Sequence, residues 1–407
     1  MNSSAQVQDL IRNHRRGEGL ARPFYFSNEI FEQELEHILG SQWMLAGHVS
    51  QLPSAGDYFV VEALGASVIV VRDGQGEINA FHNVCRHRGA RICEAASGRA
   101  SLLRCRYHGW SYKLDGELAA WRHMPEGLNK ADYSLNRCAV ATFQGCILIC
   151  LNAAAAPDPS QLLEHVLPYW NRYELGKCKV VAQRSYRIRA NWKLCIENNL
   201  ECYHCLGCHP EYTAVNAFVR ADEGVSQAAV SDFSAYRRAW EARMRSAGTL
   251  VGRSEMKSVR GQLCRAGTVP LAPGKLTASR EGRAVAPLLG SVRAYDESVT
   301  TGGIGFLSYL MAACDYALTV TYLPEDVGTT HAVMRWLVRE DAQEGRDYDV
   351  GELCFVWDET TKQDKELIEL NAQGVASRAY VPGPYSRLEN LTADFVDRYL
   401  ELMSGTT

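Results

Sequence analysis

The sequence has no long hydrophobic run. No stretch approaches the roughly 20 uninterrupted apolar residues that cross a membrane, and residues 1–20 lack the hydrophobic core of a signal peptide. We therefore expect no membrane partner and a cytoplasmic location.

An excess of charge of either sign is also lacking. The chain carries 43 basic and 47 acidic residues, so its charge does not favour nucleic acid as a partner. It also contains no Gly-rich dinucleotide fingerprint between a strand and a helix, which predicts that this chain binds neither NAD nor flavin. A small polar substrate fits this composition better.

Cysteine, by contrast, is plentiful. The chain has 14 cysteines, and in a reducing cytoplasm we expect them to be reduced core residues or metal ligands, not a disulfide framework. With 46% hydrophobic and 22% charged residues among 407, the chain has the composition of a globular protein with material for two domains.

Different patterns of secondary structure divide the chain. Short alternating strands joined by Asp-Gly turns at 73–74 and 115–116 are typical of β-hairpins, whereas strands and helices mix after the linker at 153–160. We therefore predict an α+β protein with a helical segment at 1–44, an all-β domain at 45–152 and an α+β domain at 153–407.

Three finer expectations concern the second domain. A helix is expected from Trp192 through residues 201–210, and a long helix over 349–374, ending at a glycine. Residues 222–290 are polar and rich in Ala, Arg and Ser, so we expect irregular segments there. The sequence leaves open whether this stretch closes over a substrate.

The first candidate metal site lies in the strand-rich part. Cys85 and His87 form a C-x-H pair, and after 17 intervening residues Cys105 and His108 form a C-x2-H pair. Two thiolates and two imidazoles can hold a structural zinc, or the two irons of a [2Fe-2S] cluster. A glycine follows each pair and allows tight loops to approach a buried cluster, which favours iron.

These two motifs, CRHRGA and CRYHGW, resemble those of the Rieske ferredoxin domain, over about 43–152. The resemblance implies that the four residues ligate a [2Fe-2S] cluster that relays electrons. Respiratory Rieske proteins of high potential add a disulfide between the ligand loops, but Tyr107 here leaves Cys93 without such a partner. The sequence is therefore similar to the oxygenase type.

A second candidate site lies in ECYHCLGCHP, residues 201–210. Two sets of ligands compete in this string, namely the thiolates of Cys202, Cys205 and Cys208, and the carboxylate and imidazoles of Glu201, His204 and His209. The ten residues by themselves do not decide between these sets.

The longer stretch NWKLCIENNLECYHCLGCHP resembles the catalytic motif of Rieske non-haem iron oxygenases. The resemblance implies that His204 and His209 bind a mononuclear iron. On a regular helix five residues turn about 500°, so the helix has to bend or end for both imidazoles to reach one metal. Gly207 and Pro210 are the expected weak points.

The third iron ligand is expected far along the chain. QDKELIELNAQGVAS resembles the family's last ligand helix, which implies Asp364 as the carboxylate of a facial triad. Asp358, Glu359 and Glu366 are its local competitors. The three cysteines of the motif are then expected to pack along one side of the helix and not to bind metal.

Glu201 matches the place where ring-hydroxylating relatives carry Asp. The resemblance implies a bridge in which Glu201 hydrogen-bonds His204 and, across a subunit interface, a Rieske histidine matching His108. With Glu at this place, the sequence resembles the family members that act on quaternary ammonium compounds. A surface glutamate beside a helix is the alternative.

The overall pattern resembles glycine betaine and proline betaine demethylases and choline monooxygenase. It implies a homotrimeric terminal oxygenase that receives electrons from an NAD(P)H-dependent reductase and uses O2 to hydroxylate an N-methyl group, with release of formaldehyde. An aromatic-ring dioxygenase or O-demethylase of the same family is one alternative. A Rieske electron carrier with a non-catalytic binding domain is another. The sequence does not identify the substrate-binding residues.

Overall fold

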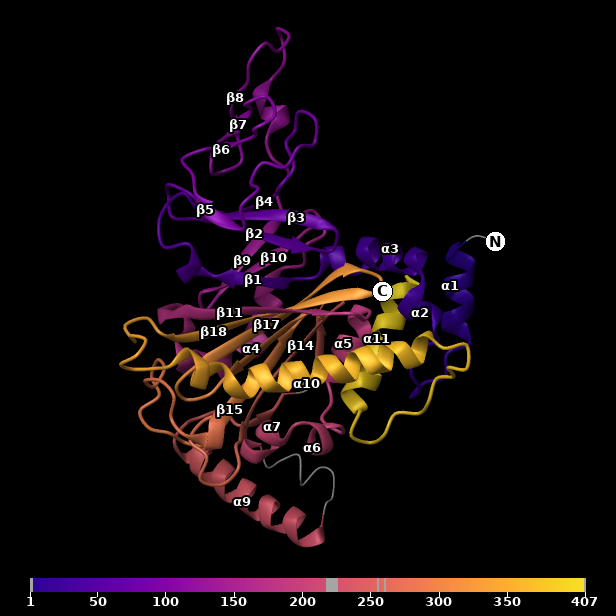
Figure 1. The fold of residues 1–407 in the computed structure, drawn as a ribbon, viewed down its shortest axis with the longest axis vertical. Helices are drawn as coiled ribbons and strands as arrows, with labels where there is room; N and C mark the ends of the chain where they lie inside the picture. The colour runs from indigo at the N-terminus through magenta and orange to yellow at the C-terminus, as the bar shows by residue number, and fades with distance from the viewer. Residues whose placement is uncertain (1–2, 217–225, 255, 260, 406–407) are drawn as a thin grey trace.

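The computed structural model describes residues 3–216, 226–254, 256–259 and 261–405. The chain forms a helical opening segment, a strand-rich part that projects from the rest, and a large antiparallel sheet with helices against it (Figure 1). This is the α+β architecture expected from the sequence. No helix among the described residues is both long and apolar enough to span a membrane.

The first helices pack against the last one. They are α1 (Ser3–Arg12), α2 (Pro23–Phe26) and α3 (Asn28–His37), and the last helix is α11 (Asn390–Ser404). A buried ion pair ties this segment to the rest, because the Lys193 ammonium lies 2.5 Å from Oε1 of Glu34 and neither side chain is exposed. Tyr399 of α11 donates a hydrogen bond to the same Glu34 oxygen.

Three antiparallel sheets make up the region between residues 44 and 150. In sheet order they are β1 (Met44–His48), β10 (Cys146–Cys150) and β9 (Ala139–Phe143); β4 (Ile78–His82), β3 (Ala66–Arg72), β2 (Asp57–Ala63) and β5 (Ser97–Arg99); and β6 (Leu103–Arg104), β7 (Ser111–Tyr112) and β8 (Leu118–Ala120). The last sheet lies at the tip, far from the large sheet (Figure 1).

The predicted Asp-Gly hairpins are present. One joins β3 to β4 and the other joins β7 to β8. Oδ1 of Asp73 accepts hydrogen bonds of 2.9 Å from the amides of Gln75 and Glu77, and Asp115 accepts one of 3.0 Å from the Glu117 amide. The aspartates thus stabilise the turns through their own side chains.

The large sheet is antiparallel, with the strand order β11-β18-β17-β16-β15-β14-β12, and β13 also pairs with β14. Its strands are β11 (Cys178–Ile188), β12 (Gly252–Arg253), β13 (Lys257–Val259), β14 (Gln262–Pro270), β15 (Ser298–Ile304), β16 (Ser308–Ala312), β17 (Ala317–Asp326) and β18 (Thr329–Arg339). Leu45 of β1 packs in one buried cluster with Leu310 of β16, so the projecting part and the large sheet share a core.

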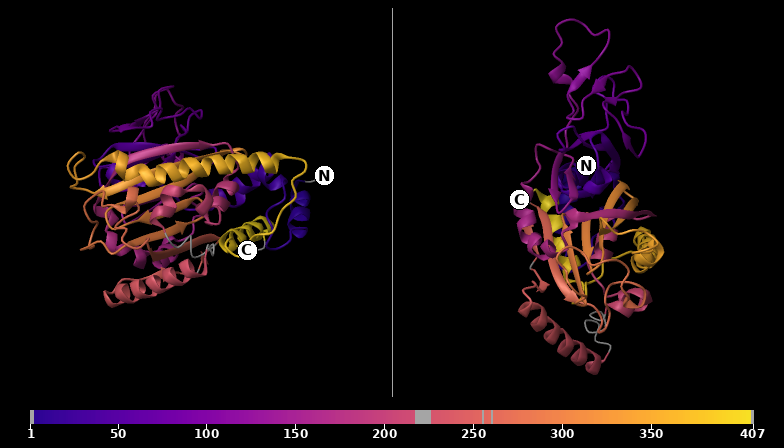
Figure 2. Two further views of the ribbon diagram at one scale, coloured as in Figure 1. Left: turned by 60° about the horizontal axis from the view of Figure 1, so that its bottom comes forward. Right: turned by 90° about the vertical axis from the view of Figure 1, so that its left-hand side faces the viewer.

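The helices described in this half, apart from α9, lie against the sheet or at its edge. With α9 included, they are α4 (Pro159–Trp170), α5 (Trp192–Asn199), α6 (Cys205–Cys208), α7 (Pro210–Val215), α9 (Gln227–Ser246) and α10 (Val350–Ala376). Figure 2 shows α10 running along the sheet while α9 stands apart from it. Single-turn 3-10 helices are η1 (Leu39–Ser41), η2 (Val49–Gln51), η3 (Lys130–Tyr133), η4 (Asn171–Tyr173), η5 (Leu175–Lys177) and η6 (Arg280–Gly282).

One expectation about this half is wrong, and another is confirmed. The helix that begins at Trp192 does not continue through 201–210, because α5 ends at Asn199 and only the single turn α6 follows within the motif. Irregular segments do occur within 222–290, over 271–279 and 283–290, and the same stretch also contains the 20-residue α9 and the strand β14. Its alanines, arginines and glutamate favour a helix over 227–246. Residues 222–225 lie outside the described part.

Candidate active site and metal centres

The two Rieske-like motifs form matching loops. In the first, the Cys85 amide donates to the carbonyl of Ala90 at 2.8 Å, and in the second the Cys105 amide donates to the carbonyl of Trp110 at 2.8 Å. Each loop turns at the glycine that follows the ligand pair, Gly89 with φ +78 and Gly109 with φ +72. Glycine reaches this left-handed conformation without steric cost, so the sequence builds two similar loops side by side.

The ligand atoms of these loops gather in like pairs. Nδ1 of His87 lies 3.0 Å from Nδ1 of His108, at the loop tips. The thiols of Cys85 and Cys105 are buried, and they contact each other. Two sulfurs together and two imidazole nitrogens together fit a two-iron cluster with sulfur on one iron and nitrogen on the other.

Neighbours that sequence reasoning missed support these loops. The Tyr112 hydroxyl lies 3.3 Å from the sulfur of Cys85 and accepts a hydrogen bond of 3.0 Å from the Arg86 amide. Trp110 stacks on His87 with ring centroids 4.9 Å apart. Both residues stand in the string HGWSY directly after the second ligand pair, which is the signal that could have found them.

In the second half the structure brings His204, His209 and Asp364 together. Oδ1 of Asp364 lies 3.3 Å from Nε2 of His204 and 3.0 Å from Nε2 of His209. The histidines flank the single turn of α6, and His209 has non-helical backbone angles (φ -124, ψ 73). The chain is thus not one continuous helix here, because α5 ends before His204 and the turn of α6 ends at His209. The angular spacing of a regular helix therefore does not separate the two imidazoles, and both reach Asp364.

The remaining imidazole nitrogens are held by other side chains. Nδ1 of His204 donates to Oε1 of Glu201 at 2.5 Å, and Nδ1 of His209 donates to Oε1 of Gln363 at 2.9 Å. Gln363 in turn donates to Glu211 at 2.9 Å. Both Nε2 atoms are thereby turned toward Asp364. In metal sites, a hydrogen bond from the other ring nitrogen orients a histidine ligand in the same way. Sequence reasoning did not identify Gln363 or Glu211.

The carboxylates that compete with Asp364 are engaged elsewhere. Asp358 pairs with Arg184 and accepts a hydrogen bond from Tyr186. Glu359 pairs with Lys362 at 2.8 Å, and Glu366 is exposed. Asp364 is therefore the acidic residue of this helix that faces the two imidazoles.

Charges in this group stabilise one another. Burial opposes protonation of His204, but the carboxylates of Asp364 and Glu201 outweigh it and raise its pKa to about 10. Burial also opposes protonation of His209, but Asp364 outweighs that effect and raises the pKa of His209. Removal from water raises the pKa of Asp364, but the two histidines outweigh this and hold that pKa below its usual value. A divalent cation can take the place of these protons, and two imidazoles with one carboxylate are the donors of a facial-triad iron site.

The cysteines of the motif differ from expectation. Cys202 and Cys205 form a disulfide, and Cys208 remains a free thiol, so they are not three reduced residues along one side of a helix. The sulfur of Cys205 does lie near the nitrogens of His204 and His209. A disulfide sulfur carries no charge, however, and metals prefer the thiolate, so the histidine and aspartate donors fit a metal better. Cys93 is free and buried, as the sequence predicts.

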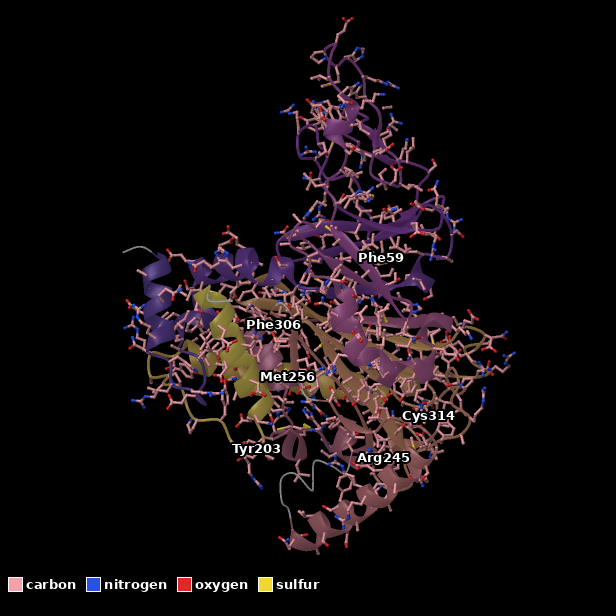
Figure 3. All side chains as sticks on the ribbon, turned by 180° about the vertical axis from the view of Figure 1, so that it is seen from behind. Phe59, Tyr203, Arg245, Met256, Phe306 and Cys314 are labelled. Atoms are coloured by element: carbon pink, nitrogen blue, oxygen red, sulfur yellow. A yellow bond between two sulfur atoms is a disulfide. The ribbon has the colours of Figure 1, made fainter. Side chains whose placement is uncertain are left out.

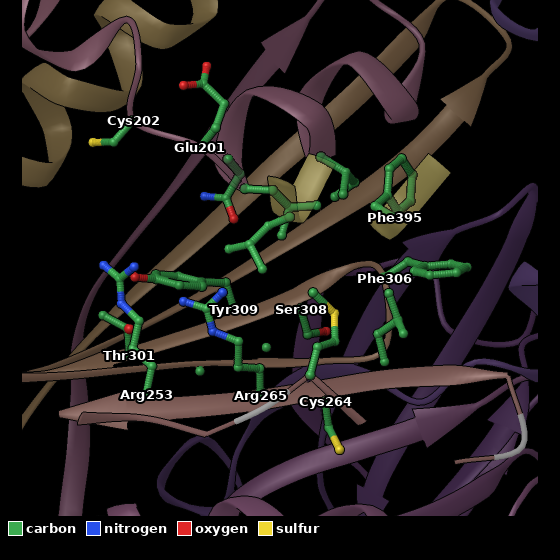
Figure 4. Close-up of a pocket in the computed structure, with 18 of the residues that line it drawn as sticks. Glu201, Cys202, Arg253, Cys264, Arg265, Thr301, Phe306, Ser308, Tyr309 and Phe395 are labelled. Carbon is green, nitrogen blue, oxygen red and sulfur yellow. The ribbon is translucent and has the colours of Figure 1, made fainter. Parts of the chain in front are cut away.

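A cavity of about 230 Å³, here called the inner cavity, lies beside the triad of His204, His209 and Asp364. Glu201 and Cys202 line it at one end, with Arg253, Arg265 and Tyr309 across from them (Figure 4). Its aromatic lining consists of Tyr212, Phe306, Tyr309, Tyr322, Trp357 and Phe395. Figure 3 shows Phe306, together with Met256 of the same wall, beside α11.

The triad stands directly behind this lining. The ring centroid of Tyr212 lies 6.4 Å from that of His209, and Tyr212 also packs against Trp357 at 5.7 Å. Burial, and to a smaller extent the nearby Asp364 carboxylate, raises the pKa of Tyr212 and Tyr322 above the usual value. Tyr212 therefore links the cavity wall to His209 of the triad.

Family models match both halves of the chain. Residues 42–144 match the Rieske [2Fe-2S] domain, and residues 175–274 and 306–405 match the catalytic domain of the ring hydroxylating alpha subunit. These domains bind a [2Fe-2S] cluster and a mononuclear non-haem iron, respectively. The predicted order, an all-β Rieske domain followed by an α+β catalytic domain, is confirmed.

Individual relatives extend this similarity over the whole chain. The chain is 36% identical to the glycine betaine monooxygenase oxygenase subunit of Pseudomonas aeruginosa (strain UCBPP-PA14), over 97% of this chain and 91% of the relative. It is 31% identical to the carnitine monooxygenase oxygenase subunit of Acinetobacter pittii (strain PHEA-2), over 46% of this chain and 52% of that one. A crystal structure of the quaternary ammonium Rieske monooxygenase CntA has the same fold, with a TM-score of 0.73, 20% identity and coverage of 97% and 98%. The chain belongs to the family of Rieske non-haem iron oxygenases.

Proposed function

We propose that this protein is the terminal oxygenase of a multicomponent monooxygenase that hydroxylates an N-methyl group of a betaine-type quaternary ammonium compound. The observation that carries the proposal is the similarity over 97% of the chain to a glycine betaine monooxygenase oxygenase subunit. The aromatic lining of the inner cavity supports it, because ring faces attract quaternary ammonium groups.

Each centre has its proposed residues. Cys85, His87, Cys105 and His108 hold the cluster, and His204, His209 and Asp364 hold the iron. When bound, the cluster supplies one-electron relay and the iron supplies O2 activation. Glu201 and Gln363 keep the imidazoles oriented by accepting hydrogen bonds from their Nδ1 atoms. The aromatic side chains exclude water and place the N-methyl group toward the triad.

The overall reaction balances simply. One oxygen atom of O2 enters a methyl C–H bond, and the other leaves as water, with two electrons and two protons supplied from outside. The product carries an N–CH2OH group. Loss of its hydroxyl proton and cleavage of the N–C bond then release formaldehyde and leave a tertiary amine.

A reductase and further copies of the chain are part of this proposal. The Rieske tip and the α6–α7 region lie at opposite ends of the molecule (Figure 1), so electrons would pass more readily between neighbouring copies, as in a homotrimer. His108 is exposed at the tip, and Glu201 already contacts His204. We propose that Glu201 bridges His204 to His108 of the partner subunit. An NAD(P)H-dependent reductase would supply the electrons in the cytoplasm.

The alternatives receive less support. An aromatic-ring dioxygenase or O-demethylase predicts an apolar cavity, whereas two arginines line this one. A simple electron carrier gives no role to the converging His204, His209 and Asp364. We retain the division into a segment at 1–44, a Rieske domain at 45–152 and a catalytic domain at 153–407 as part of the proposal.

Metal analysis and single-turnover assays test this function. The anaerobically reduced protein would be mixed with O2 and glycine betaine, proline betaine, carnitine, choline or benzoate. Formaldehyde from a quaternary ammonium compound, together with more iron than acid-labile sulfide per chain, is the expected result. Oxidation of benzoate alone would contradict the substrate class. Equal iron and sulfide in protein grown with ample iron, and no turnover of any compound, would favour the electron carrier.

A further inference from the structure

Two arginines project from neighbouring strands into the inner cavity. Arg253 of β12 lies opposite Gly267 of β14, and Arg265 stands two residues from Gly267 on the same strand. Paired residues share a face of an antiparallel sheet, as do residues two apart on one strand. Both guanidinium groups therefore point to the same side, and Figure 4 shows them next to Tyr309.

Gly267 makes this arrangement possible. A Cβ atom at this position would meet Cα and Cγ of Arg253 at 2.9 Å each, which is too close for real atoms. The absent side chain lets Arg253 lie across β14 and approach Arg265. The sheet thus brings two positive charges together at one end of the cavity, where their combined field attracts an anion.

Arg265 has no carboxylate at ion-pair distance among the described residues. Burial and the neighbouring Arg253 lower its pKa to about 10, although Tyr309 and the more distant Asp394 oppose this. A largely buried guanidinium with five N–H donors gains from a planar acceptor such as a carboxylate, which it binds through two parallel hydrogen bonds.

A second cavity, of about 350 Å³, adjoins the inner one on this side. Both cavities are lined by Arg253 and Arg265, while Asp394 lines only the second. The arginines therefore stand between the inner cavity and a more open space. The arginines thus form a cationic end of the inner cavity. Glu201 and Cys202, with the triad nearby, form its opposite end.

We propose that Arg265, assisted by Arg253, binds the carboxylate of the substrate, so that the enzyme selects quaternary ammonium carboxylates over quaternary alcohols and esters. The ammonium group then lies among the aromatic rings with a methyl group toward His204, His209 and Asp364. A cation without a carboxylate gains no contact from the arginines and is repelled by them. This inference rests on the proposed function and adds the residues that determine its selectivity.

The test compares substrates that differ only in the carboxylate. Binding and turnover are measured with glycine betaine, proline betaine and carnitine, with the methyl ester of each, and with choline, under anaerobic equilibrium dialysis and in formaldehyde assays. In wild-type protein, the preferred acid should bind at least about tenfold more tightly than its ester, as expected for hydrogen bonds to a charged group.

Three variants locate this preference. Arg265→Gln should weaken binding of the acid by about 10- to 100-fold and should not weaken binding of the ester, which loses only a repulsion. Arg265→Lys should keep part of the preference because it keeps the charge. Arg253→Gln, at a more exposed position, should cause a smaller loss of the same kind. Arg283→Gln removes an arginine that pairs with Glu281 on the surface, and serves as the control.

The possible failures are distinct. Equal binding of acid and ester by wild type, or an acid preference that survives in both Arg265→Gln and Arg253→Gln, overturns the carboxylate site. Should Arg265→Gln fail to fold, Arg253→Gln decides by itself. If wild type binds acids in an arginine-dependent way but releases no formaldehyde from any compound, the carboxylate site stands and the proposed demethylation is wrong.

Discussion

Nε2 of His209 lies 3.0 Å from Oδ1 of Asp364, although 155 residues separate them in the sequence. Asp364→Ala should therefore remove the mononuclear iron and abolish turnover, because two imidazoles alone make a weak and incomplete site. Iron analysis should show the loss of one iron per chain with unchanged sulfide and an unchanged Rieske spectrum. Asp358→Asn, which alters a carboxylate of the same helix that pairs with Arg184, is the control and should retain this iron. Full iron content in Asp364→Ala would show that another residue is the ligand.

Gln363 should act on the iron through His209. Gln363→Ala removes the acceptor that holds Nδ1 of His209, and loss of such a contact typically lowers metal affinity about 10- to 100-fold. Competition with a chelator measures this affinity directly, with the Rieske spectrum as an internal reference. Gln373→Ala changes an exposed glutamine on the same helix and is the matched control. If both variants hold iron equally well, Gln363 has no role in orienting the ligand.

Glu201 is expected to affect electron transfer more than metal content. Its carboxylate contacts Nδ1 of His204 at 2.5 Å, and Glu201→Gln keeps the shape and an acceptor while removing the charge. At saturating iron, the variant should contain both centres but oxidise its reduced cluster more slowly in single turnovers. Stopped-flow absorbance of the cluster gives this rate without relying on product. An unchanged rate would remove Glu201 from the electron route.

Local features of the fold could be predicted from the sequence. The Asp-Gly hairpins depend on contacts within a few residues, as at Asp73, and so do the loops that turn at Gly89 and Gly109. Family resemblance extended this to His204, His209 and Asp364, which the structure brings together. The choice of Asp364 over Asp358 depends on a distant residue, because Arg184 of β11 neutralises Asp358.

Other parts required the tertiary structure. The two arginines meet only because β12 pairs with β14 opposite Gly267, within a stretch whose polar composition predicts irregular segments. Gln363 stands next to Asp364, but its contact with His209 depends on how α10 lies against α7. The end of α5 at Asn199 also lacks the glycine or proline that usually indicates where a helix stops.

The disulfide between Cys202 and Cys205 should be structurally minor. It closes a loop of only a few residues, so it restricts the unfolded chain little and adds at most about 2 kcal/mol. Cys202→Ser and Cys205→Ser should keep nearly all of the mononuclear iron, as should Cys208→Ser, which removes a free thiol. Thiol titration of the denatured protein, before and after reduction, should give two further thiols in wild type and Cys208→Ser, and none in the other two variants. Loss of iron in any of the three would restore cysteine as a candidate ligand.

Glu197 should make stability depend on pH. Burial raises its pKa to about 7 from 4.5, and the Tyr25 hydroxyl, which donates to it at 2.8 Å, opposes this only in part. The folded state therefore holds the proton more tightly than the unfolded state. The resulting stabilisation is complete below pH 4.5, decreases as the pH rises toward 7, and amounts to no more than about 3 kcal/mol.

Glu197→Gln should remove this pH dependence, because an amide stays neutral throughout. Thermal unfolding of metal-loaded protein at pH 5.5 and pH 8 measures the effect: wild type should lose several degrees more than Glu197→Gln on going to the higher pH. Glu366→Gln, at an exposed position of α10, should behave like wild type and controls for the loss of a carboxylate. Identical shifts in wild type and Glu197→Gln would show that Glu197 is already ionised in the folded protein at pH 5.5.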